Sequence, residues 1–293
     1  MINSFKKFYR NLFQGQLFII KAGGRIITDK ESRENLFSNI QELTNDGIKV
    51  LFIYGGGEAI DVALKEAGLT PYKIDGRRIS SENDIKIIKK TLVGDLGFKI
   101  SETLVKFKFP STVLNAIPPH WSNAKRRPPQ DGVERFDGTL ENINENAIRE
   151  HFLATNLAIC PCLAFSMDGT ALNINADNVA IEIATRTAAS KLILLTDIDG
   201  VMVDGKVQSV LTAREIEGLI EDKIVTDGMR VKLESCIHAL RSGVNRVHIL
   251  NGFKRDSLRN EVYTSSGTGT MIVREKEKQL YLKQELKTQG EKT

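Results

Sequence analysis

The sequence has few cysteines and no long apolar run, and both scarcities exclude classes of protein. Only three cysteines occur in 293 residues: Cys160 and Cys162 in the segment CPC, and Cys236 alone. Three cysteines are too few, and odd in number, to build a disulfide framework or to complete a zinc site. We therefore expect all three to be small buried side chains in a protein from a reducing compartment. No stretch approaches the roughly 20 apolar residues of a membrane span. These absences predict a cytoplasmic protein.

Strong charge is lacking as well. The net charge is only +4, and no compact basic stripe runs with aromatic residues, so neither nucleic acid nor a membrane is an expected partner. The hydrophobic share of 41% is that of an ordinary globular chain, long enough for one large or two medium domains.

The N-terminal segment has no acidic residue before Asp29. The apolar run 17–20 is too short for a signal peptide, and a transit peptide is a weaker alternative. Apolar side chains recur here at helical spacing: Phe5, Phe8, Tyr9, Leu12 and Phe13. We therefore expect an amphipathic helix that packs on a subunit partner or on its own domain.

Short apolar runs alternate with helical patterns along the rest of the chain. The runs, expected to be strands buried on both faces, are 17–20, 50–54, 111–117, 157–165, 191–197 and 246–250. The helical patterns cover 31–47, 58–68, 81–107, 212–220 and 229–243. This alternation predicts an α/β fold, a three-layer sandwich with a mostly parallel central sheet between helix layers, plus the N-terminal helix. The stretch 117–142 holds four of the seven prolines and predicts a loop or hairpin excursion.

Two of the predicted strands run into glycine-rich turns. Gly55, Gly56 and Gly57 follow one strand and open a helix, where backbone amides favour an anion; a plain tight turn rarely needs three glycines. The turn is neither a P-loop nor a dinucleotide fingerprint. Lys21, followed by Gly23 and Gly24, ends another strand, on the side where open α/β sheets bind ligands.

Polar residues gather at three further places. Asn173, Asn175 and Asp177 precede an apolar helix, for which Asp177 or Asn178 could simply be the cap. Thr196, Asp197, Asp199 and Gly200 follow the most apolar strand. Asp227 and Gly228 precede Lys232, which would lie near the start of a helix, where a cation opposes the helix dipole. Lys232 is therefore either an incidental surface charge or placed for an anion.

Two glycine turns, two lysines and a lone acid together predict phosphoryl transfer, which needs mainly charge neutralisation and positioning. A carboxylate acceptor, with a pKa of about 4.3, is already ionised and needs no base. Asp177 would hold the two lysines together.

In its motifs the chain resembles the amino acid kinase superfamily, and within it the N-acetyl-L-glutamate kinases. The resemblance spans roughly residues 16–274 and rests on seven segments in the family's order: FIIKAGG, FIYGGGEAI, KIDGRRIS, LNINADNVA, LILLTDIDGV, TDGMRVK and TSSGTGTMI. It implies ATP-dependent phosphorylation of the side-chain carboxylate of N-acetyl-L-glutamate, a step of arginine biosynthesis.

The resemblance also implies roles for single residues. Lys21 and Lys232 would neutralise the phosphoryl group in flight, and Asp177 would orient both lysines. The acceptor would be bound by Gly55, Gly56, Gly57, Arg78 and Asn173, with Arg78 on a carboxylate and Asn173 on the acetamido end. ATP would be bound by Gly23, Gly24, Thr196, Asp197, Gly200, Thr226, Asp227, Gly228 and Met229. Mg²⁺ would be held mainly by ATP oxygens and water, so no protein metal site is expected.

The implied organisation is an interaction helix at 1–15, an amino-acid-binding and dimerisation lobe at 16–185, an ATP lobe at 186–275 and a charged tail at 276–293. The protein would be a homo-oligomer, a dimer or a hexamer built through the N-terminal helix. Glu261, Gly267 and Gly269 match residues that help bind arginine in arginine-inhibited members.

Four departures from the family pattern keep other functions open. IPPHWSNAK replaces a glycine-rich loop, Ala22 is smaller than usual, Arg77 adds a charge beside Arg78, and Asp256 replaces a histidine. The alternatives are a catalytically weak regulatory relative that binds arginine or acetylglutamate, or a kinase for a related acyl amino acid such as carrier-linked 2-aminoadipate. An acetylglutamate synthase would need on the order of 100 further residues after GTGTMI.

Overall fold

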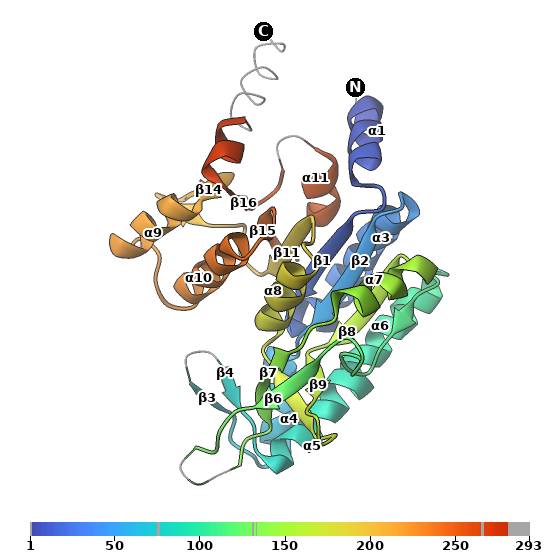
Figure 1. The fold of residues 1–293 in the computed structure, drawn as a ribbon, viewed down its shortest axis with the longest axis vertical. Coiled ribbons are helices and arrows are strands. Elements are labelled where there is room, and N and C mark those ends of the chain that lie inside the picture. Colours follow the sequence, from blue (N-terminus) through green and yellow to red (C-terminus); the bar gives the residue numbers. More distant parts are fainter. Residues whose placement is uncertain (1, 75–76, 131, 133, 265–266, 281–293) are drawn as a thin grey trace.

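The centre of the molecule is one eight-stranded sheet, seen in the computed structural model in Figure 1. The structure describes residues 2–74, 77–130, 132, 134–264 and 267–280. In spatial order the strands are β14 (Val210–Thr212), β16 (Thr270–Val273), β15 (Val247–Asn251), β11 (Lys191–Thr196), β1 (Leu17–Ala22), β2 (Lys49–Tyr54), β8 (Leu157–Pro161) and β5 (Thr112–Val113). All neighbours are parallel except β15 and β16, which confirms the mostly parallel sheet.

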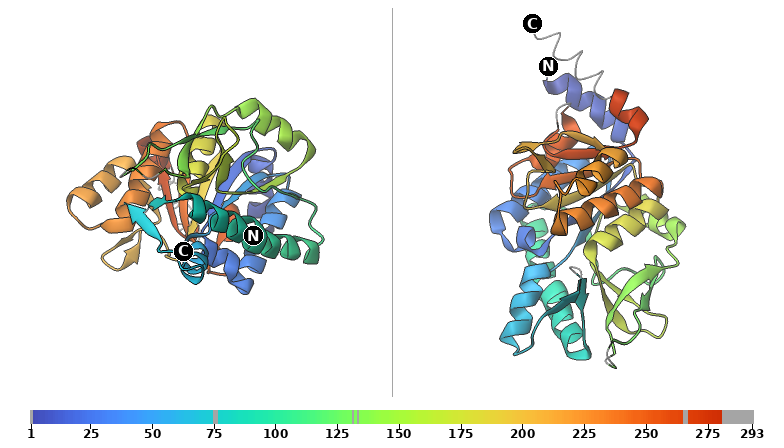
Figure 2. Two further views of the ribbon diagram at one scale, coloured as in Figure 1. Left: turned by 90° about the horizontal axis from the view of Figure 1, so that it is seen from below. Right: turned by 90° about the vertical axis from the view of Figure 1, so that its left-hand side faces the viewer.

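Helices cover both faces of this sheet (Figures 1 and 2). One layer packs through α3 on β2 and contains α2 (Gly24–Thr28), α3 (Lys30–Asn45), α4 (Gly57–Glu66) and α11 (Ser257–Tyr263). The other packs through α8 on β1, β2 and β11 and contains α8 (Ala176–Arg186), α10 (Asp227–Arg241) and α9 (Ala213–Glu221). The three-layer sandwich is therefore confirmed. The predicted lobe boundaries stay a prediction.

The apolar runs form the core because strands with helices on both faces exclude water from every side chain. Phe18, Ile19 and Ile20 in β1 have no exposed surface, and neither have the residues from Val50 to Tyr54 in β2. A capping box begins α9, with Thr212 and Glu215 bonded to each other's backbone amides.

Two of the predicted strands were wrong in extent. Only Thr112–Val113 of the run 111–117 pairs, because this segment is the edge of the sheet and leaves it after two residues. The run 157–165 is not one strand but two, β8 and β9 (Leu163–Phe165), which belong to different sheets. The chain changes sheets at Cys162, whose amide still donates to the Tyr54 carbonyl while Leu163 already pairs with Asn173.

The long helix predicted over 81–107 is interrupted. It consists of α5 (Glu82–Lys89), a π-helical segment (Lys90–Leu96) and α6 (Gly97–Lys106). The wider turn of a π-helix leaves backbone groups for other partners. Here the Tyr54 hydroxyl donates to the Leu92 carbonyl at 3.1 Å, which ties the helix to the end of β2.

The proline-rich stretch forms the predicted hairpin excursion. Strands β6 (Asn123–Arg126) and β7 (Asp137–Glu141) pair antiparallel and join β10 (Ala171–Ile174) and β9 in a four-stranded sheet. A smaller hairpin, β3 (Tyr72–Ile74) and β4 (Arg77–Ile79), lies at the same end of the molecule (Figure 1). Other short elements are β12 (Met202–Val203), β13 (Lys206–Val207) and α7 (Glu145–Ala154).

The N-terminal segment is helical, as predicted, over α1 (Ile2–Phe13). Tyr9 stacks on Phe13, which contacts Phe18 edge to face, so one side of α1 packs on its own chain. Phe8 and Leu12 on the remaining side are 60% and 50% exposed. Residues 275–280 are helical, and the rest of the predicted charged tail lies outside the described residues.

The three cysteines are free and buried, as expected. Burial raises the pKa of the Cys236 thiol to about 12 and that of Cys162 to about 11, so both are neutral at physiological pH. In the described part of the chain, no helix is both long and apolar enough to cross a bilayer.

Candidate active site

The site lies where three central strands end. Strands β2, β1 and β11 run parallel, and Ala22 at the end of β1 pairs with Tyr54 on one side and Leu195 on the other. Both glycine turns and Thr196 therefore open on one edge of the sheet, which is where open α/β sheets bind ligands. They line a cavity of about 330 Å³, the lower part of the range for small-molecule sites.

The two glycine turns pack backbone against backbone. A Cβ atom on Gly24 would lie 3.0 Å from the backbone C and Cα atoms of Gly56. The Gly55 amide donates to the Ala22 carbonyl at 3.1 Å, which holds the turns in this arrangement. Gly23 and Gly57, in contrast, have open space at the Cβ position, so a ligand can approach their backbone.

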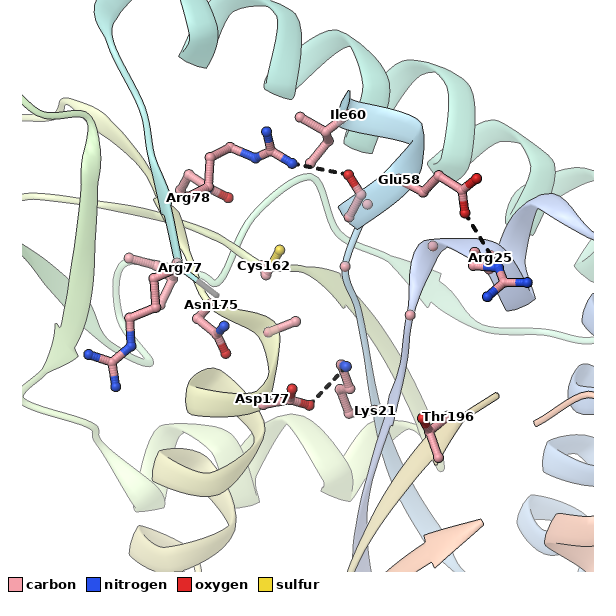
Figure 3. Close-up of a pocket in the computed structure, with 18 of the residues that line it drawn as sticks. Lys21, Arg25, Glu58, Ile60, Arg77, Arg78, Cys162, Asn175, Asp177 and Thr196 are labelled. Carbon is pink, nitrogen blue, oxygen red and sulfur yellow. Dashed lines mark hydrogen bonds and ion pairs between the residues drawn. The ribbon is translucent and has the colours of Figure 1, made fainter. Parts of the chain in front are cut away.

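Lys21 at the end of β1 forms an ion pair with Asp177 from α8, with 2.8 Å between Nζ and Oδ1 (Figure 3). Burial alone would raise the pKa of the Asp177 carboxyl, but the charges of Lys21 and Lys232 hold that pKa below its usual range. Asp177 is therefore an anion placed between two cations.

The alternative that Asp177 or Asn178 is merely the helix cap was wrong. The cap of α8 is Asn175, whose side chain accepts from the Asn178 amide. Because the Asn175 side chain accepts a hydrogen bond from a backbone amide at the start of α8, the Asp177 carboxylate in the first turn can pair with Lys21 instead.

Lys232 approaches the same point from α10. It lies in the second turn of that helix, and its Nζ is 3.4 Å from the Thr196 hydroxyl. Burial lowers the pKa of Lys232, and the nearby Asp177 charge partly opposes that shift. Lys232 is therefore not an incidental surface charge: its ammonium group faces the cavity, beside the end of β11.

Arg78 and Asn173 line the other end of the cavity. The Arg78 side chain is 6% exposed, forms an ion pair with Asp61 at 2.6 Å and donates to the Gly57 carbonyl at 3.0 Å. Its Nη1 is buried and has no partner among the described residues. Asn173 Nδ2 is 3.4 Å from the Ser80 hydroxyl. An unused buried guanidinium nitrogen is a ready donor for a carboxylate.

Arg25 is a site residue that sequence reasoning missed. It follows Gly24 directly, and its guanidinium forms ion pairs with Asp197 at 2.8 Å and with Glu58 at 3.4 Å. The pair with Glu58 is drawn in Figure 3. It also lies 5.6 Å from the centre of the Phe253 ring. The only signal in the sequence was its position after the second glycine of KAGGR, since Glu58 and Asp197 are distant along the chain.

Most predicted site residues line this cavity: Lys21, Gly23, Gly24, Gly55, Gly56, Gly57, Arg78, Asn173, Asp177, Thr196, Asp197 and Lys232. Gly200, Thr226 and Met229 do not, although Thr226 begins α10 and Gly200 packs against Thr270. The surroundings of Asp227 and Gly228 lie outside what the structure describes. The roles predicted for all of these residues, in catalysis, acceptor binding and ATP binding, stay predictions.

The loop IPPHWSNAK does not line the cavity. Trp121 is fully buried and packs edge to face on His151, and its amide donates to the Pro118 carbonyl. Trp121 thus fills the core under the hairpin excursion, whereas Pro118 is partly buried and Pro119 is exposed. What the excursion contributes to the cavity is further along it, at Arg127, Asp137 and Gly138.

The predicted arginine-site residues form a separate cluster. Glu261 accepts from the Thr268 amide at 2.6 Å and lies 2.7 Å from His248 Nδ1. His248 Nε2 is 3.0 Å from Lys191 Nζ, which lies 5.1 Å from the Phe13 ring of α1. A Cβ on Gly267 or Gly269 would collide with Glu261 or the Ile249 carbonyl, so both positions require glycine.

The donor set fits a phosphate ligand better than a protein-bound metal. Three lysines and four arginines line the cavity together with open glycine backbone. Among the described residues, no group of three His, Cys, Asp or Glu side chains could hold a metal ion. Mg²⁺ is commonly bound through one or two carboxylates plus substrate phosphates, and Asp197 is such a carboxylate.

Comparison with known proteins identifies relatives of this chain that are kinases. The chain is 33% identical over 276 residues to an acetylglutamate kinase of Kosmotoga olearia, with 90% of this chain and 93% of that protein covered. It is 32% identical to one of Methanococcus maripaludis, covering 90% and 94%.

Solved structures agree on the fold. An N-acetylglutamate synthase from Neisseria gonorrhoeae, complexed with coenzyme A and N-acetyl-glutamate, matches with a TM-score of 0.85 and 26% identity. The match covers 94% of this chain, which spans only 63% of the synthase chain. An isopentenyl phosphate kinase at 17% identity shares the fold, with a TM-score of 0.59. The model of the amino acid kinase family matches residues 16–251, and the chain belongs to that family.

Proposed function

We propose that the protein is an ATP-dependent kinase that phosphorylates the side-chain carboxylate of N-acetyl-L-glutamate, in arginine biosynthesis. The observation that carries the proposal is the Lys21–Asp177 pair, with Lys232 opposite, between two glycine turns at the end of β1. Relatives named acetylglutamate kinase over nearly their whole length support the same acceptor. We also assign the enzyme to the cytoplasm.

In the proposed reaction an acceptor carboxylate oxygen attacks the γ-phosphorus of ATP. The bond from phosphorus to the β–γ bridging oxygen breaks, ADP leaves, and no proton needs to move. Lys21 and Lys232 neutralise the charge on the transferring group, and Asp177 holds Lys21 in place. Groups already oriented towards developing charge lower the barrier because they need no reorganisation. Mg²⁺, held mainly by nucleotide oxygens and water, would supply further neutralisation.

The acceptor would lie between the reacting centre and the β3–β4 hairpin. The unused Nη1 of Arg78 would bind its α-carboxylate, and Asn173 would bind the acetamido group. Within the Gly55–Gly57 turn, the amides of Gly56 and Gly57 would bind the carboxylate that reacts, because the Gly55 amide already donates to the Ala22 carbonyl. Arg78 is positioned for this role by Asp61 and the Gly57 carbonyl.

Hydroxylamine converts acyl phosphates to hydroxamates, so it tests the proposal directly. With ATP, Mg²⁺ and N-acetyl-L-glutamate we expect hydroxamate, and none with free glutamate or 2-aminoadipate. No hydroxamate from any acceptor, in protein that still binds ATP, would favour the catalytically weak regulatory relative. A signal with aminoadipate alone would favour a kinase for a related acyl amino acid.

A second proposal concerns arginine, which would bind at the Glu261, Gly267 and Gly269 cluster. The contact of Lys191 with Phe13 supports it, because it links this cluster to α1. The exposed Phe8 and Leu12 give α1 an apolar face for a second subunit, so we propose a dimer or hexamer built through this helix. Loss of the hydroxamate signal on adding arginine is the expected result.

Substitution of Arg25 provides a separate test of how the protein binds ATP. Its ion pairs with Asp197 and Glu58 are exposed and therefore weak, so the guanidinium is available to ATP phosphates. We expect Arg25→Gln to raise the KM for ATP by about 10-fold, the scale of one charged hydrogen bond, and to leave the KM for the acceptor nearly unchanged. Arg255→Gln, at a side chain 86% exposed, is the control. An unchanged KM for ATP would leave Arg25 as a surface bridge.

A further inference from the structure

The acceptor end of the cavity is more cationic than N-acetyl-L-glutamate requires. Four cations line it, Lys73, Arg77, Arg78 and Arg127. Within the described ranges, the carboxylates that pair with them are Asp61 and Asp137. An N-acetyl acceptor brings one carboxylate to this end, since its other carboxylate is at the lysines.

Asp61 forms ion pairs with two of these cations. Its Oδ2 lies 2.6 Å from Lys73 Nζ, and its Oδ1 lies 2.6 Å from Arg78 Nη2. Arg78 also donates to the Gly57 carbonyl. Lys73 and Arg78 therefore form one anchored unit with Asp61, and the α-carboxylate of the acceptor would complete it at Arg78 Nη1.

Asp137 is committed to an arginine outside the cavity. Arg135 binds both of its oxygens, from Nε at 3.0 Å and from Nη2 at 2.6 Å, and this carboxylate is almost fully buried. The Nε of Arg127 is 3.5 Å from Oδ2, an ion pair without a hydrogen bond. Among the described residues, the Arg127 guanidinium thus keeps its donors for another acceptor.

Arg127 lies at the end of the pocket assigned to the acyl group. Its amide donates to the Asp137 carbonyl at 3.0 Å, and Asp137 is the register partner of Asn173 in the neighbouring strand. Asn173 is the residue proposed to bind the acetamido group. Arg77, on β4, has no ion pair with any described residue, and its side chain extends away from Lys21 and Asp177 (Figure 3). Two arginines from different hairpins therefore line the cavity on the side where the acyl group of the proposed acceptor would lie.

We propose that the preferred acceptor carries a second anionic group at the end of its acyl chain, as in the monoamide of a dicarboxylic acid, and that Arg127 and Arg77 select it. This rests on the proposed kinase activity. An acetyl group ends in a methyl, which accepts no hydrogen bond and leaves both guanidinium charges uncompensated. A terminal carboxylate accepts the planar donors of Arg127 in a bidentate arrangement.

In the hydroxamate assay, three acceptors separate the effect of the terminal charge from the effect of acyl-chain length. N-succinyl-L-glutamate has the terminal carboxylate, N-butanoyl-L-glutamate has the same chain length without it, and N-acetyl-L-glutamate has neither. We expect kcat/KM for the succinyl compound to exceed both others by at least about 10-fold, the scale of one hydrogen bond to a charged group. Equal values for all three would overturn the inference and leave the kinase proposal intact. Activity with none of them would overturn both.

Single substitutions test which residues cause the preference for N-succinyl-L-glutamate. Arg127→Gln should lower kcat/KM for N-succinyl-L-glutamate by about 10-fold and change that for N-acetyl-L-glutamate by less than about threefold. The protein should still fold, because Asp137 keeps both hydrogen bonds from Arg135. Arg77→Gln should act in the same direction. Lys125→Gln, on β6 and outside the cavity, is the matched loss of charge and should change neither value. A succinyl preference that survives both arginine variants would contradict the assignment.

Discussion

Lys232→Ala is expected to lower kcat by about 10² to 10³-fold while changing the KM for the acceptor by less than about threefold, the pattern of an interaction made mainly in the transition state. The ammonium group lies beside Thr196, across the cavity from the glycine turns, where charge develops on the transferring phosphoryl group. Steady-state kinetics with N-acetyl-L-glutamate measures both constants. Arg230→Ala, an exposed cation on the same helix, is the control.

The pH dependence provides a second readout of the same residue. Because burial lowers the pKa of Lys232, its charge is lost at a lower pH than that of a free lysine. Only the protonated form neutralises phosphate, so kcat/KM should fall as pH rises, before the ordinary lysine range. Lys232→Arg should remove this alkaline fall, since arginine stays charged. Equal kcat in wild type and Lys232→Ala would show that Lys232 has no role in transfer.

Gly24→Ala is expected to lower kcat/KM by at least about 10²-fold, because an added Cβ would meet backbone atoms rather than a flexible side chain. Its nearest neighbours would be the C and Cα atoms of Gly56 at 3.0 Å. The glycine turns would have to move apart, and displacements of about 1 Å in a positioned site cost on the order of 10²-fold. Kinetics together with a melting curve measures the effect.

Gly218→Ala is the matched control for this substitution. Gly218 lies within α9 and has open space at its Cβ position, so alanine should leave activity unchanged and stabilise the helix slightly. Should Gly24→Ala retain full activity in folded protein, the close approach of the two turns would not matter for catalysis.

The sequence was sufficient for features that depend on local chemistry. The apolar runs that became β1, β2, β11 and β15 were recognised because strands covered on both faces carry mostly apolar side chains. Lys21 and the two glycine turns were recognised because they follow such strands. Parallel strands bring their carboxyl ends to one edge, so the grouping of these turns was predictable as well.

Features that depend on competition between neighbours were not predictable. Asn175 and Asp177 are both suitable helix caps, and only the folded chain shows that Asn175 takes the cap and leaves Asp177 to Lys21. The sequence did not predict that the chain passes from one sheet to another at Cys162, because one continuous apolar run can contribute strands to two sheets. The interruption of the long helix was not predicted either, and there the Leu92 carbonyl accepts a hydrogen bond from Tyr54, a residue of a different element.

The sequence by itself determined the fold class, the edge of the sheet at which the proposed phosphate site lies and the residue types that would neutralise charge there. Each follows from hydrophobic pattern, glycine geometry and charge, which are properties of short segments. Only the tertiary structure decided which charged side chains can still bind a ligand in the cavity. Asp61 and Asp137 are taken by Lys73, Arg78 and Arg135, whereas Arg25 and Arg127 are left facing the cavity. These pairings join segments far apart in the chain, and their strengths depend on burial, which no local pattern encodes.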